Sequence, residues 1–207
     1  MRWIKYIAVF APVLIGAPNG TPPRLSMCPT VDLKPAPAAA IRCGRSCGRD
    51  RWAVKTLTDP DRVRIDTVPV TTTVESLAAL PPPPYRPQYG RVAPTETTIF
   101  CIEGMIYDPP QPQLDGDIHV VVAGLQDSSV TMITEIPDPR CYRVCSSGYA
   151  HLFARARDSL EQRLRVWTTD TLRIRIMGVG FFDRNHRQYR PAPNFIELHP
   201  VLAIAFP

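Results

Sequence analysis

The sequence lacks the motifs that mark the common enzyme classes. It has no H-E-x-x-H zinc motif, no phosphate-binding P-loop, no G-x-S-x-G nucleophile turn and no EF-hand calcium loop. The uncharged, largely apolar run from Tyr6 to Ala17 is too short to span a bilayer comfortably. Any activity must therefore be inferred from the arrangement of ordinary polar residues.

Lysine is scarce, and the charges are unevenly distributed. Only three of the 24 basic residues are lysine. Residues 95–139 contain eight acidic residues and no lysine or arginine, whereas residues 140–190 contain eleven arginines. The net charge is −2 over residues 95–207, against +5 for the whole chain. A net-acidic region argues against strong non-specific DNA binding, which needs several uncompensated phosphate contacts, although a local arginine-rich face remains possible.

The N-terminus has the pattern of a secretory signal. Arg2 and Lys5 form a positive start, and the apolar run that follows ends in the small residues Gly16 and Ala17. We therefore predict a signal peptide over residues 1–20, and an exported protein that is periplasmic or secreted. An uncleaved N-terminal anchor or a disordered tail is the alternative. No transmembrane segment is expected beyond this signal or anchor.

Proline is abundant, with 24 residues in the chain. Pro81–Pro84 begins a stretch that cannot be regular helix or sheet. Residues 21–94 are therefore expected to form a proline-rich arm or linker with short anchoring segments, among them the one around Trp52.

Six cysteines are present, and four of them form two C-x3-C pairs. An even number of cysteines in an exported chain favours disulfides over zinc, whose ribbons usually use C-x2-C. The sequence leaves their pairing open. The six are Cys28, Cys43, Cys47, Cys101, Cys141 and Cys145.

Residues 95–207 alternate between strand and helix patterns. Alternating apolar residues predict strands, and apolar residues at helical spacing predict one helix. The order β-β-β-α-β-β is that of the OB-fold, a five-stranded barrel, so a mostly β, OB-like small barrel is expected. A half-barrel or another α+β packing fits the same order. The expected strands are 97–107, 117–124, 130–136, 171–179 and 196–206, and the expected helix is 147–164.

One polar group lies near the C-terminus. Glu197 and His199 are two residues apart, so on a strand they point to the same face. A hairpin between the last two strands would bring Asp183 and His186 near them, and His119 could approach the same end. Asp183, His186, Glu197 and His199 are the candidate metal ligands, for zinc or another divalent ion.

The same residues suit general acid–base chemistry, with Glu197, His199 and His186 as catalytic candidates. The alternative is a buried hydrogen-bonded network that only stabilises the hairpin, with no cofactor.

Arginines cluster around the same hairpin. Arg173, Arg175 and Arg187, with aromatic residues nearby, resemble a surface that binds an oligonucleotide. The alternative is a solvated strand face balanced by the acids of residues 95–139. The second and third expected strands lack the aromatic pattern of an oligonucleotide platform.

Several segments resemble uncharacterised, exported bacterial proteins that end in a similar N-x-I-E-L-H-P-V segment. These segments include Gly180–Asp183, Asn194–Val201, Thr95–Thr98 and Arg51–Thr56. The resemblance covers about residues 43–207. It implies export and one shared domain, and it implies no activity.

Two hypotheses follow. The first is an extracytoplasmic, non-catalytic binding or structural module whose partner is a protein or an oligonucleotide. The second is a metal-dependent hydrolase, most plausibly a secreted nuclease.

Overall fold

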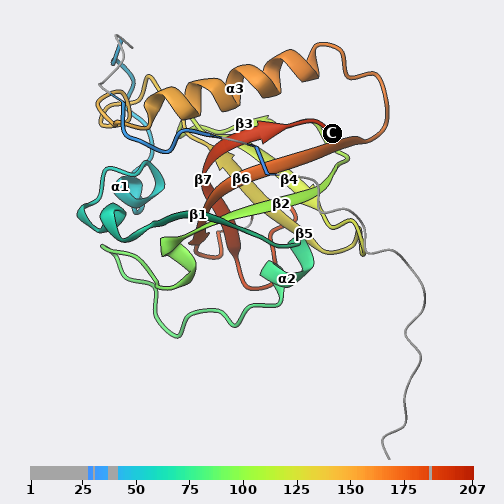
Figure 1. The fold of residues 1–207 in the computed structure, drawn as a ribbon, viewed down its shortest axis with the longest axis horizontal. Helices are drawn as coiled ribbons and strands as arrows, with labels where there is room; N and C mark the ends of the chain where they lie inside the picture. Colours follow the sequence, from blue (N-terminus) through green and yellow to red (C-terminus); the bar gives the residue numbers. More distant parts are fainter. Residues whose placement is uncertain (1–27, 30, 37–41, 187) are drawn as a thin grey trace, which may run out of the picture.

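The structure is a computed structural model that describes residues 28–29, 31–36, 42–186 and 188–207. The predicted signal peptide over residues 1–20 lies outside the described residues. The described chain is mostly β, with one main helix, α3 (Ala150–Leu164), lying along one side of the strands (Figure 1).

Five strands close into a small mixed barrel. Around the barrel the order is β2, β6, β7, β5 and β4, and the pairing of Met105 with Ala123 returns from β4 to β2. β5 and β7 run parallel, and the other barrel pairs are antiparallel. The OB-like small barrel predicted from the sequence is therefore confirmed. The barrel strands are β2 (Thr98–Ile106), β4 (Ile118–Ala123), β5 (Thr131–Ile136), β6 (Leu172–Phe182) and β7 (Ile196–Ala205).

Gly104 allows the barrel to close. A Cβ atom at this position would lie 2.4 Å from Cγ1 of Val122 and 2.5 Å from the carbonyl oxygen of Ala123. These atoms belong to β4, so the backbones of β2 and β4 approach too closely for a side chain between them. Closure at this seam therefore depends on glycine.

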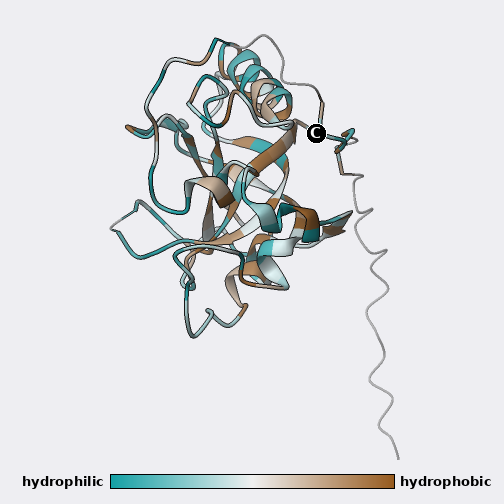
Figure 2. Cartoon of the chain, turned by 90° about the vertical axis from the view of Figure 1, so that its left-hand side faces the viewer, coloured by the Kyte–Doolittle hydropathy of each residue, from teal (hydrophilic) through white to brown (hydrophobic). Residues whose placement is uncertain are grey.

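Period-two alternation divides the strands between two environments. Val120 and Val122 of β4 are fully buried in the main core, together with inward residues of the other barrel strands. Leu160 of α3 joins this core, while Phe153 of the same helix packs in a second core with Trp52. Figure 2 shows the brown hydrophobic residues concentrated in the strands and the teal hydrophilic residues along the outer loops.

The element boundaries differ slightly from those expected. The helix begins at Ala150 rather than Ser147, because Ser147 belongs to the preceding turn, where its Oγ accepts from the backbone N–H of Tyr149 at 3.2 Å. β6 continues to Phe182 instead of ending at Val179.

Residues 43–94 contribute short elements outside the barrel. These are α1 (Trp52–Lys55), the 3-10 helix η1 (Pro60–Arg64), β1 (Asp66–Thr71), which pairs in parallel with β2, and α2 (Val74–Ala78). A further 3-10 helix, η2 (Thr95–Thr97), leads into β2, and the two-residue β3 (Gln111–Pro112) pairs with β4.

Two buried ion pairs hold this region: one joins it to η2, and the other lies within it. Arg51 donates to both carboxylate oxygens of Glu96, at 2.9 and 2.5 Å. Arg91 donates to both carboxylate oxygens of Asp59, at 3.0 and 2.6 Å. Bidentate arginine–carboxylate pairs of this kind are stronger and more specific in geometry than neutral hydrogen bonds.

All six cysteines form disulfides: Cys28 with Cys101, Cys43 with Cys145, and Cys47 with Cys141. The two C-x3-C pairs are therefore bonded to each other. Three disulfides are characteristic of proteins in an oxidising compartment outside the cytoplasm. Within the described residues, no helix has both the length and the apolar character needed to cross a membrane.

Candidate ligand cleft and buried cluster

A cleft of about 800 Å³ opens on the outer face of the barrel. Its floor includes His119 and Val121 of β4 and Glu135 of β5, whose side chains point away from the core. Three other segments form its walls: residues 48–55, the β2–β4 connection and the β6–β7 connection. Their lining residues are Gly48, Arg49, Asp50, Trp52, Lys55, Asp108, Pro109, Gln111, Gln113, Asp115, Asp183, Arg184, His186, Gln188 and Tyr189.

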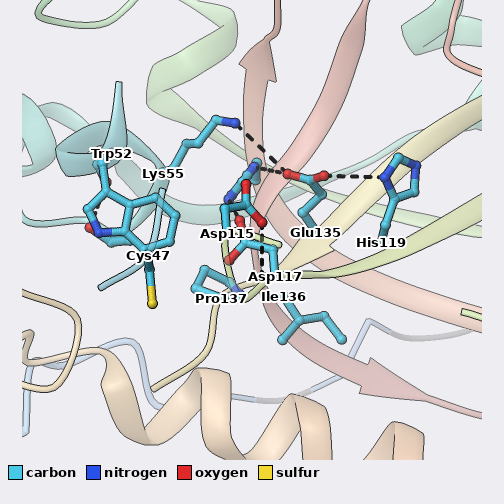
Figure 3. Close-up of polar contacts among 12 residues, drawn as sticks. Cys47, Trp52, Lys55, Asp115, Asp117, His119, Glu135, Ile136 and Pro137 are labelled. Carbon is cyan, nitrogen blue, oxygen red and sulfur yellow. Dashed lines mark hydrogen bonds and ion pairs between the residues drawn. The ribbon is translucent and has the colours of Figure 1, made fainter. Parts of the chain in front are cut away.

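Seven ionisable residues gather at the inner end of this cleft, and we call them the buried cluster. Glu135 lies at its centre, between Lys55 and His119 (Figure 3). Its carboxylate oxygens lie 4.0 Å from Nζ of Lys55 and 3.4 Å from Nδ1 of His119. The members are Lys55, Asp117, His119, Glu135, Asp183, Glu197 and His199, all of them buried.

His199 lies between two carboxylates. Its Nδ1 is 2.7 Å from Oε2 of Glu135, and its Nε2 is 3.2 Å from Oδ2 of Asp117. Both His199 and Asp117 are 0% exposed. Among the described residues, neither ring nitrogen of His199 and neither carboxylate oxygen of Asp117 has a partner with hydrogen-bond geometry.

Asp183 and Glu197 lie beside this group and are linked through one amide. The Nε2 of Gln188 donates to Glu197 at 2.6 Å and to Asp183 at 3.2 Å. His186 lies 2.6 Å from Asp183 through its Nε2, and Lys55 lies 3.9 Å from the other oxygen of Asp183.

The backbone around Asp117 is fixed by a turn and by α3. Gly116 has a φ of 97°, a left-handed conformation that glycine adopts without strain. Arg157 of α3 donates to the carbonyl oxygens of Gly116, Ile136 and Pro137. One arginine therefore joins the start of β4 to the end of β5, which holds Asp117 and Glu135 in register.

The two central glutamates have opposite pKa shifts. Burial raises the pKa of Glu197 to about 7, and the nearby carboxylate of Glu135 adds to this effect. Burial alone would also raise the pKa of Glu135, but the positive charges of His199 and Lys55 outweigh it and lower this pKa to about 2. Such divergence between neighbouring acids is common at functional sites, because it separates a proton donor from a permanent anion.

The pKa values of the other cluster members also depend on burial and on neighbouring charges. Burial raises the pKa of Asp117 and lowers the pKa of His119. For His199, burial lowers the pKa, but Glu135 and Asp117 raise it well above its ordinary value. Burial likewise disfavours the charged form of Lys55, yet the surrounding carboxylates raise its pKa overall.

The four metal candidates predicted from the sequence fall into two groups. Glu197 and His199 both lie in β7, and His199 Nδ1 is 3.8 Å from Glu197 Oε2. Asp183 and His186 contact each other in the β6–β7 connection, and Gln188 links them to Glu197. The three described residues whose ligand atoms lie within 4.8 Å of one another are instead Asp117, Glu135 and His199.

The arginine candidates lie elsewhere. Arg173 and Arg175 of β6 both pair with Glu103 of β2, and neither lines the cleft. Arg187 lies outside the described residues. Arg184 lines the cleft and is 3.3 Å from Asp50.

Sequence reasoning did not select Asp117, Glu135 and Lys55 as site residues. The alternation of apolar residues over 117–124 puts Asp117 on the outward face of the expected strand. The same alternation puts many exposed residues on outward faces, so it does not single out Asp117. Lys55 comes from a segment that was interpreted as an arm. Asp117 and Glu135 join the site only through the pairing of β5 with β4 and β7, and no local sequence pattern specifies that pairing.

No family model matches the chain, and no curated protein or solved structure is significantly similar to it. The class is therefore defined by the barrel and the cleft alone: an OB-like small barrel with three disulfides and a polar cleft.

Proposed function

We propose that the protein is an extracytoplasmic binding module that holds a polar ligand in the cleft. One observation carries the proposal, the position of the cleft on the barrel. The cleft is formed by β4 and β5, which are the second and third barrel strands in chain order, and by the β2–β4 and β6–β7 connections. These are the surfaces with which OB-folds bind oligonucleotides and oligosaccharides. The predicted signal peptide would place the module in the periplasm or outside the cell.

The lining favours a neutral, hydroxyl-rich ligand such as a short oligosaccharide. Five acidic residues line the cleft against three lysines and arginines, an unfavourable balance for a phosphate backbone. Gln111, Gln113 and Gln188 offer both donors and acceptors, which hydroxyl groups can satisfy. Tyr189, 61% exposed, presents an aromatic face at the rim.

The proposal is tested by calorimetric titration with chitohexaose, maltohexaose and a thymidine dodecamer. We expect one of the saccharides to bind and the dodecamer to give no signal. Tyr189→Ala should weaken saccharide binding roughly tenfold, equivalent to about 1.4 kcal/mol. Tyr85→Ala is the matched control, because Tyr85 is 72% exposed and does not line the cleft. Binding of the dodecamer alone would refute the ligand class, and equal losses in both variants would refute the cleft.

A second candidate function is a metal-dependent hydrolase, most plausibly a nuclease. The observation that favours it is the buried cluster, where Glu197, with a pKa of about 7, neighbours Glu135, with a pKa of about 2. An acid that titrates near neutrality is suited to proton transfer.

The hydrolase hypothesis is tested with single- and double-stranded nucleic acid on one gel, with divalent ions or with a chelator. Degradation that the chelator prevents would support it, and Glu197→Gln should then abolish the degradation. Intact substrate in every lane would remove the nuclease and leave the binding module.

A further inference from the structure

The geometry points to a metal centre in the buried cluster, and we propose that Asp117, Glu135 and His199 bind one zinc ion. These residues come from three places in the sequence, one just before β4, one in β5 and one in β7. The barrel brings one ligand atom from each within 4.8 Å of the others. The inference goes beyond the binding module, because a structural or catalytic ion is compatible with any ligand in the cleft.

Unpartnered polar atoms carry the proposal. Both oxygens of Asp117 and both ring nitrogens of His199 are buried without a hydrogen bond among the described residues. The His199 nitrogens nevertheless lie 2.7 and 3.2 Å from carboxylate oxygens. A buried polar group that lacks a hydrogen bond destabilises the folded state. One cation could bind a single ring nitrogen of His199 together with one oxygen each of Asp117 and Glu135, whose ligand atoms lie within 4.8 Å of one another.

The charge of the surroundings favours an additional cation. Four buried carboxylates, those of Asp117, Glu135, Asp183 and Glu197, share the cluster with one lysine, Lys55, and with the imidazoles of His119 and His199. Buried charges are expensive unless they are paired or coordinate a metal. The competing explanation is a proton on each nitrogen of His199, shared with the two carboxylates. Both contacts lie at ion-pair distance, but neither meets the geometry of a hydrogen bond, so this explanation leaves the ring nitrogens without a hydrogen bond.

The donor set selects the ion. One imidazole nitrogen with two carboxylates suits zinc, whereas calcium prefers six to eight oxygen ligands. Three protein ligands with a remaining position for water are typical of catalytic zinc sites rather than structural ones. Of the three residues, Glu135 also lines the cleft, so a ligand in the cleft would lie next to the metal site.

The test uses the exported, disulfide-bonded chain after treatment with a chelator. Titration with zinc chloride, checked by elemental analysis, should give one equivalent of zinc per chain, and calcium chloride should give none. Asp117→Asn and Glu135→Gln should each weaken zinc binding at least about 100-fold. Asp183→Asn is the matched control, because this buried carboxylate is in the same cluster but outside the triangle, and it should weaken zinc binding by only about tenfold, the lower end of the cost of changing a residue beside the ligands.

Two results would overturn the proposal. One is a wild-type chain that binds no zinc and whose unfolding temperature does not rise with zinc, a measurement that is independent of whether any variant folds. The other is a loss of zinc binding in Asp183→Asn with binding retained in Asp117→Asn, which would place the ion at Asp183 and His186. Saccharide titrations of the zinc-free chain separate this outcome from failure of the binding module.

Discussion

Removing one partner of the buried pair of Arg91 and Asp59 should be among the most destabilising single changes in the protein. Their side chains are 0% and 4% exposed. Arg91 makes two hydrogen bonds to Asp59 and two more, at 3.0 and 3.1 Å, to the carbonyl oxygens of Glu96 and Val54. It therefore joins α1, η1 and η2 at one point.

Removing Arg91 leaves a buried carboxylate and two carbonyls without their donor. Breaking a buried pair costs about 3–5 kcal/mol, and each lost carbonyl bond adds about 1 kcal/mol. We therefore expect Arg91→Met to lower the free energy of unfolding by about 5 kcal/mol or more. Asp59→Asn keeps the shape and one acceptor, so its cost should lie near the lower end of about 3–5 kcal/mol.

The control is an exposed pair in the same region. Arg64 and Asp61 lie 3.8 Å apart, with side chains 55% and 36% exposed, so Arg64→Met should cost no more than about 1 kcal/mol. Urea unfolding followed by circular dichroism measures all three variants, with a constant slope required for comparison. Equal losses in Arg91→Met and Arg64→Met would refute the reasoning.

Three further predictions follow from the fold. Gly104→Val should destabilise the barrel by about 1–3 kcal/mol by overpacking the β2–β4 seam, as measured by urea unfolding. Gly44→Ala is the control and should leave the stability unchanged, because no atom lies within 4 Å of the new Cβ. A Gly104→Val variant of unchanged stability would contradict closure at this seam. The paired change Cys47→Ser with Cys141→Ser should lower the free energy of unfolding by about 2–5 kcal/mol, and an unchanged thermal midpoint would contradict it. Glu75 accepts hydrogen bonds from the backbone N–H groups of Gln126 and Asp127. Burial raises the pKa of Glu75, but these hydrogen bonds lower it overall. The stability that Glu75 contributes is therefore present above its ordinary pKa of 4.5 and is lost as the pH falls through the lowered pKa. Glu75→Gln should therefore show a smaller fall in thermal midpoint between pH 7 and pH 3 than the wild type, and identical falls would count against the assignment.

The architecture could be predicted because each barrel strand carries its own local pattern. In β4, Val120 and Val122 alternate with His119 and Val121, and the first set is in the core while the second faces the cleft. The helical spacing of Phe153, Ala156 and Leu160 likewise predicted α3. These patterns depend on neighbours a few residues away, so a single sequence contains them.

The candidate site could be predicted only in part, because it depends on contacts between distant segments. Glu197 and His199 share a strand, and their spacing showed that they share a face. Glu135 joins them only because β5 runs parallel to β7, with Ile133 paired to Glu197 across about 60 residues of sequence. No local pattern specifies that neighbour. Lys55 joins the buried cluster because α1 packs against the barrel, and the buried ion pairs of Arg51 and Arg91 hold α1 in place.

The disulfides determine how the protein would respond to proteolysis. Each of the three joins a cysteine before residue 48 to a cysteine after residue 100. The proline-rich loop between α2 and η2, with Tyr85 and Tyr89 exposed, lies between these two groups. A protease that cut this loop once would leave two fragments held by three covalent bonds, one carrying Lys55 and the other the rest of the buried cluster. In a protease-rich extracellular space such a nicked protein would retain both halves of its cleft.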